Sequence, residues 1–165
     1  MSRLSVFTVF TLTTRSPFGH QSVLFEPAIE HNGTDEQKAK WLSLARSGTI
    51  LGTYCQTELG HGSFVRGLET TATFHSATDE FVIHSPTVSS AKFWPAGLGT
   101  STTHAVVMAQ LVVGEKSPGP HLFIVQIRSL QTGQPRTGVK MGDIVLKMAY
   151  VYLSFSLVAT DQSQL

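Results

Sequence analysis

Residues 34–56 read TDEQKAKWLSLARSGTILGTYCQ, and their pattern changes from helical to extended at Gly48. Thr34 and Gln37 stand at the spacing of a capping box, in which each side chain satisfies a backbone N–H group of the other. Apolar residues then recur at helical spacing, at Ala39, Leu42 and Ala45. Because glycine commonly ends a helix, the stretch predicts a helix over 34–46 that stops before Gly48.

Beyond Gly48 the chain consists of short β-branched and aromatic runs separated by turn-forming residues. These runs predict strands at 49–56, 68–75, 80–84, 104–113 and 121–128. The separators at 77–79, 116–120 and 131–138 are rich in residues that favour turns. No helical pattern interrupts the series, so the sequence predicts a meander that closes into a barrel or sandwich, and an α+β fold overall.

Composition limits the classes of partner and site. The 165 residues are 41% apolar and 14% charged, enough for one domain with its own core plus a fragment of another. A net charge of +1 gives no broad field to attract nucleic acid or an anionic membrane. The single cysteine, Cys55, excludes an internal disulfide, and the scattered histidines lack the paired spacing of metal ligands.

Two apolar stretches lie near the ends of the chain. Residues 4–12 have the outline of a signal peptide, but threonines dilute them and no small-x-small cleavage site follows, so we expect a buried segment. Residues 145–159 are too short to span a bilayer comfortably and include Lys147, so we expect no membrane span. The final Ser163-Gln164-Leu165 resembles the Ser-Lys-Leu peroxisomal address, with glutamine in place of lysine.

Two glycine-containing turns hold the candidate site residues. Taken alone, Thr57 is a strand-end threonine, residues 60–63 (GHGS) form a surface turn, and Trp94 is a core aromatic residue. The glycines of the first turn are not followed by a helical pattern, which excludes the phosphate cradle of a doubly wound nucleotide fold. Cys55 as a nucleophile would need a positioned histidine, and His61 is the one nearby in sequence.

Several segments of the sequence resemble those of one known protein family. LGTYCQTELGHGSFVRGLETTA at 51–72 resembles the peroxisomal acyl-CoA oxidases, and the likeness continues through EFVIHSPT at 80–87. Further similar words follow in the family's order: KFWPAGLG at 92–99, THAVVMAQL at 103–111, HLFIVQIR at 121–128 and GDI at 142–144. Upstream, GTDEQKAKWLSLA at 33–45 is similar to the last helical part of the family's N-terminal α-domain, so the resemblance covers roughly 25–144.

The resemblance implies a domain division. Residues 1–48 would be the end of the N-terminal α-domain, and 49–144 the β-barrel middle domain of the acyl-CoA dehydrogenase/oxidase fold. Residues 145–165 would form a divergent apolar tail, since the glycine-proline-lysine and aspartate-asparagine-glycine elements that continue the family are absent. The family's catalytic glutamate lies in its C-terminal helical half. The resemblance therefore implies no catalytic base here, and we expect the chain alone to be inactive.

The resemblance also implies chemistry: FAD-dependent conversion of fatty acyl-CoA and O2 to trans-2-enoyl-CoA and H2O2, in peroxisomal β-oxidation, by a homodimer. It assigns flavin binding to Thr57, Gly60, Gly62, Trp94, Ala96 and Gly97, and acyl-CoA contact to His61 and Ser63. The family has glycine at the position of Ala96. An alanine there preserves flavin binding if the backbone angles suit a non-glycine residue, and weakens it if φ must be positive.

A second hypothesis remains open at this point. The chain could be a non-catalytic barrel module, such as a truncated splice product, that binds flavin weakly or binds a partner protein. Flavin co-purification separates the two hypotheses.

Overall fold

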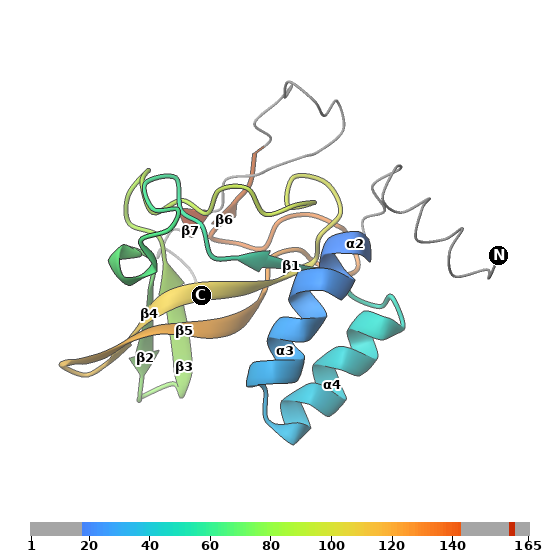
Figure 1. Ribbon diagram of the computed structural model, residues 1–165, viewed down its shortest axis with the longest axis horizontal. Helices are drawn as coiled ribbons and strands as arrows, with labels where there is room; N and C mark the ends of the chain where they lie inside the picture. Colours follow the sequence, from blue (N-terminus) through green and yellow to red (C-terminus); the bar gives the residue numbers. More distant parts are fainter. Residues whose placement is uncertain (1–17, 143–158, 161–165) are drawn as a thin grey trace.

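The computed structural model describes residues 18–142 and 159–160. A helical N-terminal part lies beside a five-stranded sheet, which confirms the predicted α+β class (Figure 1). The predicted buried segment at 4–12, most of the apolar tail and the final tripeptide lie outside the described residues. Within the described part, no helix is both long enough and apolar enough to cross a membrane.

Residues 18–32 form a continuous helical segment that the sequence pattern did not predict. It runs through α2 (Phe18–His20), the π-helical turn η1 (Gln21–Phe25) and α3 (Glu26–Asn32). The backbone N–H of Glu26 donates to the carbonyl of Gln21, five residues back, directly before Pro27. Because proline lacks an N–H and clashes with the carbonyl four residues back, a shifted hydrogen-bond ladder accommodates it.

Helix α4 (Asp35–Arg46) confirms the predicted helix. The capping box is present: the Thr34 hydroxyl accepts from the Gln37 N–H at 3.3 Å, and the Gln37 side chain accepts from the Thr34 N–H at 2.9 Å. Gly48 follows with φ of 73°, a conformation that glycine adopts without steric cost.

The sheet comprises β1 (Gly52–Cys55), β2 (Thr71–His75), β3 (Glu80–His84), β4 (His104–Val113) and β5 (Lys116–Gln126). A short pair, β6 (Val139–Lys140) with β7 (Ala159–Thr160), lies apart from it. The bounds of β3 and β4 agree with prediction. The turn predicted at 116–120 is wrong, because these residues already belong to β5. Strand β5 tolerates Pro118 and Pro120 because β4 is its one described partner. The other edge of β5 makes no hydrogen bonds to a further described strand, so it can hold residues without an N–H group.

The strand order is not a meander. Strand β4 is central: β5 runs antiparallel along one edge, while β1 and β2 pair in parallel with successive parts of the other edge. β1 is in register with 104–107 and β2 with 110–112, and β3 completes a hairpin with β2. The ten residues of β4 provide an edge long enough for two short strands end to end.

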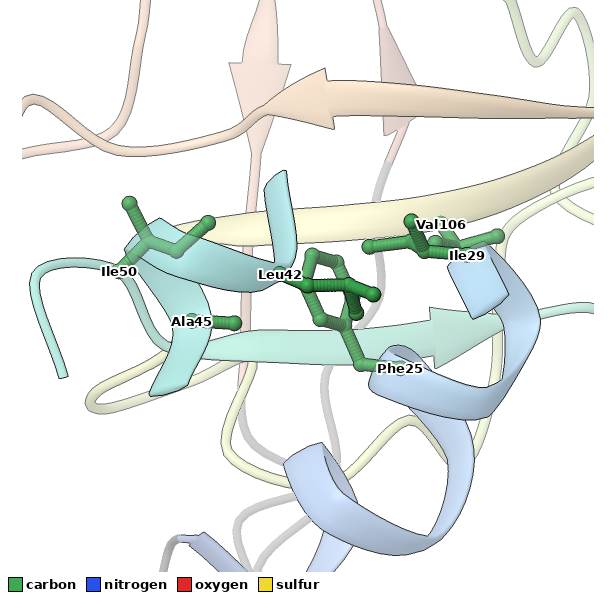
Figure 2. Packing of buried hydrophobic residues seen from close by; sticks show 6 residues of the cluster. All are labelled: Phe25, Ile29, Leu42, Ala45, Ile50 and Val106. Carbon is green, nitrogen blue, oxygen red and sulfur yellow. The ribbon is translucent and has the colours of Figure 1, made fainter. Parts of the chain in front are cut away.

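The helices and the sheet share a hydrophobic core. Its buried members are Phe25, Ile29, Leu42, Ala45, Ile50 and Val106. Figure 2 shows side chains from α3 and α4 meeting between the helices and the strand that carries Val106. A second core forms around Cys55, Leu98 and Ile127, with side chains of β3, β4 and β5 packed in it. The helical part is therefore fixed against β1 and β4, next to the segments that carry the candidate site.

Candidate functional site

A hollow of about 290 Å³ opens where the start of the helical segment meets the end of β1. Three stretches of chain line it: the first helical turns, residues 53–57, and residues 93–96. The lining residues are His20, Leu24, Thr53, Tyr54, Gln56, Thr57, Phe93, Trp94, Pro95 and Ala96. Three of the predicted flavin-binding residues, Thr57, Trp94 and Ala96, thus lie around one hollow.

A backbone hydrogen bond joins the two predicted flavin segments. The N–H of Phe93 donates to the carbonyl of Thr57 at 2.9 Å, so Thr57 and the aromatic pair are neighbours. The Thr57 hydroxyl makes no hydrogen bond to any other residue that the structure describes, and Thr57 lines the hollow. It is therefore available to a ligand.

Trp94 has an unusual backbone conformation. Its φ is 80°, and it shares a positive φ with only one other described non-glycine residue, Asp79. Trp94 is 56% exposed as a residue, and its indole meets the Phe93 ring edge-on, with centroids 5.7 Å apart. A large side chain held at positive φ costs free energy, and such strain clusters at binding sites.

Ala96 does not need glycine's conformational freedom. It is absent from the described residues with positive φ, whereas the next residue, Gly97, has φ of 74°. The carbonyl of Ala96 accepts from the Thr102 hydroxyl at 3.2 Å, and the Gly97 carbonyl accepts from the N–H groups of residues 100–102. The turn geometry therefore tolerates alanine where the family has glycine.

The loop predicted to complete the site lies outside the lining of the hollow. Gly60, Gly62 and Ser63 are exposed, and the Gly60 N–H donates to the carbonyl of Ser89 at 2.9 Å. The ring of His61 turns toward protein: its Nδ1 lies 3.1 Å from the Glu58 carboxylate. Gly97 likewise does not line the hollow.

Behind the hollow lies a buried ion pair that the sequence reasoning did not assign. Glu58 and Lys92 are 2% and 1% exposed, and Lys92 Nζ lies 3.1 Å from Glu58 Oε1. Burial raises the pKa of Glu58. Hydrogen bonds from Glu69 and Thr70 and the charge of Lys92 together lower it by more, so the pKa lies below its ordinary value. Burial lowers the pKa of Lys92, and the Glu58 carboxylate opposes that shift.

Cys55 is unsuited to nucleophilic chemistry. It is 1% exposed, and burial raises the pKa of its thiol to about 12, against a smaller opposing effect of Lys92. The thiolate form that attacks electrophiles is therefore scarce. Within the described residues no group of three or more histidine, cysteine or carboxylate side chains is placed to hold a metal ion.

Comparison with known proteins gives matches to one family. Residues 8–51 match the sequence family described as acyl-coenzyme A oxidase N-terminal. Peroxisomal acyl-coenzyme A oxidase 1 of Arabidopsis thaliana is 58% identical over 125 residues, which cover 76% of this chain and 19% of that protein. The human protein of the same name is 48% identical over 134 residues, covering 81% and 20%. The chain belongs to the acyl-CoA oxidase family.

Solved structures of acyl-CoA oxidases share the fold. Arabidopsis thaliana acyl-CoA oxidase 1 matches with a TM-score of 0.86 and 49% identity, over 88% of this chain and 22% of that one. Caenorhabditis elegans acyl-CoA oxidase-2, solved with FAD, ascaroside-CoA and ATP, matches with a TM-score of 0.85 and 43% identity, over the same shares. The chain thus spans about a fifth of the acyl-CoA oxidases that it matches.

Sequence reasoning missed part of the lining of this acyl-CoA oxidase hollow. His20 and Leu24 come from the helical segment that was not predicted; Tyr54 lies in β1 and Gln56 directly follows that strand. One signal was present. Gln21, Phe25 and Ile29 recur at four-residue spacing, and all three are buried.

Proposed function

We propose that this chain forms the flavin-facing part of an FAD-dependent fatty acyl-CoA oxidase. The observation that carries the proposal is the meeting of Thr57, Trp94 and Ala96 around one hollow in a chain of this family. The lining suits a flat ring with a polar edge, because it offers an aromatic wall and a hydroxyl without a partner among the described residues. A relative solved with FAD and ascaroside-CoA supports a flavin and a CoA ester as ligands here.

Each lining group has a definite role in this proposal. The Thr57 hydroxyl donates to a polar atom at the edge of the flavin, and the Ala96 backbone borders the same edge. Phe93 and Trp94 wall the ring and exclude water. The loop at 60–63 begins three residues after Thr57: His61 and Ser63 are assigned to acyl-CoA, while Gly60 and Gly62, which the resemblance assigns to the flavin, lie outside the lining of the hollow. When bound, the flavin supplies the redox chemistry that no side chain can.

The proposed reaction converts fatty acyl-CoA and O2 to trans-2-enoyl-CoA and H2O2. It needs a base for the acyl α-proton; the resemblance assigns that role to a glutamate in the family's C-terminal helical half, and the described lining of the hollow contains no carboxylate side chain. We therefore expect the purified chain to bind flavin without producing peroxide. Peroxide formation from FAD and a fatty acyl-CoA, at the rate of a full-length oxidase, would contradict this expectation.

The finer architecture belongs to the same proposal: residues 1–48 end the N-terminal α-domain, 49–144 form the β-barrel middle domain, and 145–165 form a tail. The rings of Phe81 on β3 and Phe123 on β5 lie 5.2 Å apart, so two strands at opposite ends of the sheet approach each other, as closure requires. Peroxisomal location and homodimerisation are proposed from the family, whose cited relatives are named peroxisomal.

Flavin titration of the purified chain tests the proposal. The chain should quench FAD fluorescence and give a resolved visible spectrum, and Thr57→Val should weaken binding by about 2- to 10-fold, the range for one hydrogen bond. Thr78→Val, in an exposed turn, is the matched control and should leave the affinity unchanged. A folded chain that stays colourless and self-associates would favour the alternative, an interaction module.

A further inference from the structure

We infer that the buried Glu58–Lys92 ion pair is the positioning device of the flavin site, holding the Thr57 segment and the Trp94 turn in register. The inference rests on the proposed function in taking flavin to be the ligand of the two segments. The alignment of the two segments with each other is a property of this chain and does not depend on the ligand. Glu58 and Lys92 are positioning residues in this proposal, since neither lines the hollow.

The ammonium group of Lys92 is fully used by acceptors on two other stretches of the chain. Its three N–H bonds have three acceptors: Glu58 Oε1 at 3.1 Å, the carbonyl of Gln56 at 3.1 Å and the carbonyl of Met108 at 2.7 Å. Two of these acceptors flank Thr57 in sequence, and the third lies on β4. Lys92 therefore ties both neighbours of Thr57 to the central strand.

The Glu58 carboxylate extends the same network to the start of β2. Oε1 also accepts from the Thr70 N–H at 2.9 Å, and Oε2 accepts from the Glu69 N–H at 2.9 Å. The ring of His61 contacts Oε2 at 3.1 Å. A buried carboxylate with these partners is held in one place, because moving it would leave several polar groups without hydrogen bonds.

The ion pair and the hollow lie on opposite sides of the same two extended segments. Glu58 and Lys92 form an antiparallel bridge, flanked by hydrogen bonds from Phe93 N–H to the Thr57 carbonyl and from Leu59 N–H to the Ala91 carbonyl, both 2.9 Å. Successive side chains of extended backbone point in opposite directions. Glu58 and Lys92 therefore point inward, while their neighbours Thr57 and Phe93 line the hollow.

If the ion pair only stabilised the fold, its replacement by uncharged residues would leave the alignment of the two segments unchanged. A buried pair can often be replaced by uncharged residues of similar volume without loss of stability, whereas removal of one partner leaves an unpaired buried charge. The informative variant is therefore Glu58→Gln/Lys92→Met, which buries no charge but lacks the three-way ammonium tie. If the pair sets the register, the local geometry fails in this variant even where the fold survives.

Amide hydrogen exchange of the full chain tests the register without any cofactor. In the double variant, the amides of Leu59 and Phe93 should lose at least tenfold of their protection, while amides of the β4–β5 ladder keep theirs. The control variant Asp35→Asn/Lys38→Met removes an exposed pair on α4, at 4.0 Å, and should change neither set. Unchanged protection at Leu59 and Phe93 would overturn the inference. Should the double variant fail to fold, Glu58→Gln/Lys92→Gln, which likewise buries no charge, is read in the same way.

Titration with FAD provides the second readout. We expect the double variant to bind FAD at least tenfold more weakly than the parent chain, with a shifted visible spectrum, and the exposed-pair control to bind as the parent does. Affinity within twofold of the parent would count against positioning. If the parent chain binds no FAD, the proposed function fails, while hydrogen exchange still decides whether Glu58 and Lys92 set the register.

Discussion

The ring of Phe25 lies directly against the α-carbon of Gly52, where a β-carbon would overlap its ring atoms. The same glycine donates its N–H to the buried side chain of Gln21 at 3.1 Å, and Gln21 in turn donates to the carbonyl of Ala45 at 2.6 Å. The helical segment therefore approaches the first strand as closely as a backbone without a side chain permits. This contact brings His20 and Leu24 to the rim of the hollow.

Gly52→Ala should destabilise the chain by about 1–3 kcal/mol, the usual cost of overpacking a filled core. The free energy of unfolding in urea, followed by circular dichroism, measures the effect. Gly62→Ala is the control, because a β-carbon there meets no atom within 4 Å and its φ is not positive. Equal stability of the two variants would contradict the close contact.

Gly97→Ala should lower stability for two reasons that a second variant separates. Gly97 has φ of 74°, and a β-carbon there would lie 2.6 Å from the Thr102 hydroxyl oxygen. The left-handed conformation alone costs alanine about 1–2 kcal/mol. Gly48→Ala shares that conformation, with φ of 73°, but meets open space. In urea unfolding, Gly97→Ala should therefore lower the free energy of unfolding more than Gly48→Ala does. Equal losses in the two variants would show that the contact with Thr102 costs nothing.

Cys55 should resist thiol reagents in the native chain. Burial raises the pKa of its thiol from 9.0 to about 12, which makes the thiolate about a thousandfold scarcer at a given pH, and the sulfur is also shielded. Ellman's reagent at pH 8 should release its coloured product only as urea unfolds the chain. Rapid stoichiometric reaction without denaturant would show that the second core is open around Cys55.

The buried imidazole of His104 should make the chain less stable in mild acid. Burial lowers the pKa of folded His104 below its ordinary value of 6.5, so below about pH 6.5 the unfolded chain binds a proton that the folded chain does not. The stability that comes from keeping His104 neutral is fully present above pH 6.5 and is lost as the pH falls through the lowered pKa of the folded state. His20, whose pKa burial also lowers, acts in the same direction.

Unfolding free energies between pH 7.5 and 5.5 check this expectation. The decline should be shallower in His104→Gln than in the parent chain, while the exposed control His75→Gln should follow the parent. The ring of His104 also packs against Trp41, with centroids 5.6 Å apart, so absolute stability falls in His104→Gln. The pH slope is therefore the decisive quantity, and an unchanged slope would contradict a buried neutral imidazole.

The sequence by itself determined the elements whose cause is local. The capping box at Thr34 and Gln37 predicts the start of α4, and the β-branched runs predict the bounds of β3 and β4, because caps and side-chain alternation act within a few residues. The segments that resemble the family also single out Thr57 and Trp94, which the fold brings together.

The tertiary structure alone decided how these elements meet. That β4 pairs with both β1 and β2, and that Glu58 and Lys92 form a buried pair behind the hollow, depends on residues distant in sequence. Strand partners and buried charges are chosen by long-range burial and hydrogen bonding, which leave no periodic trace in the chain. The helical segment meets β1 where Phe25 packs on Gly52, and Lys92 contacts Glu58 beside Thr57; no local sequence pattern predicts either contact.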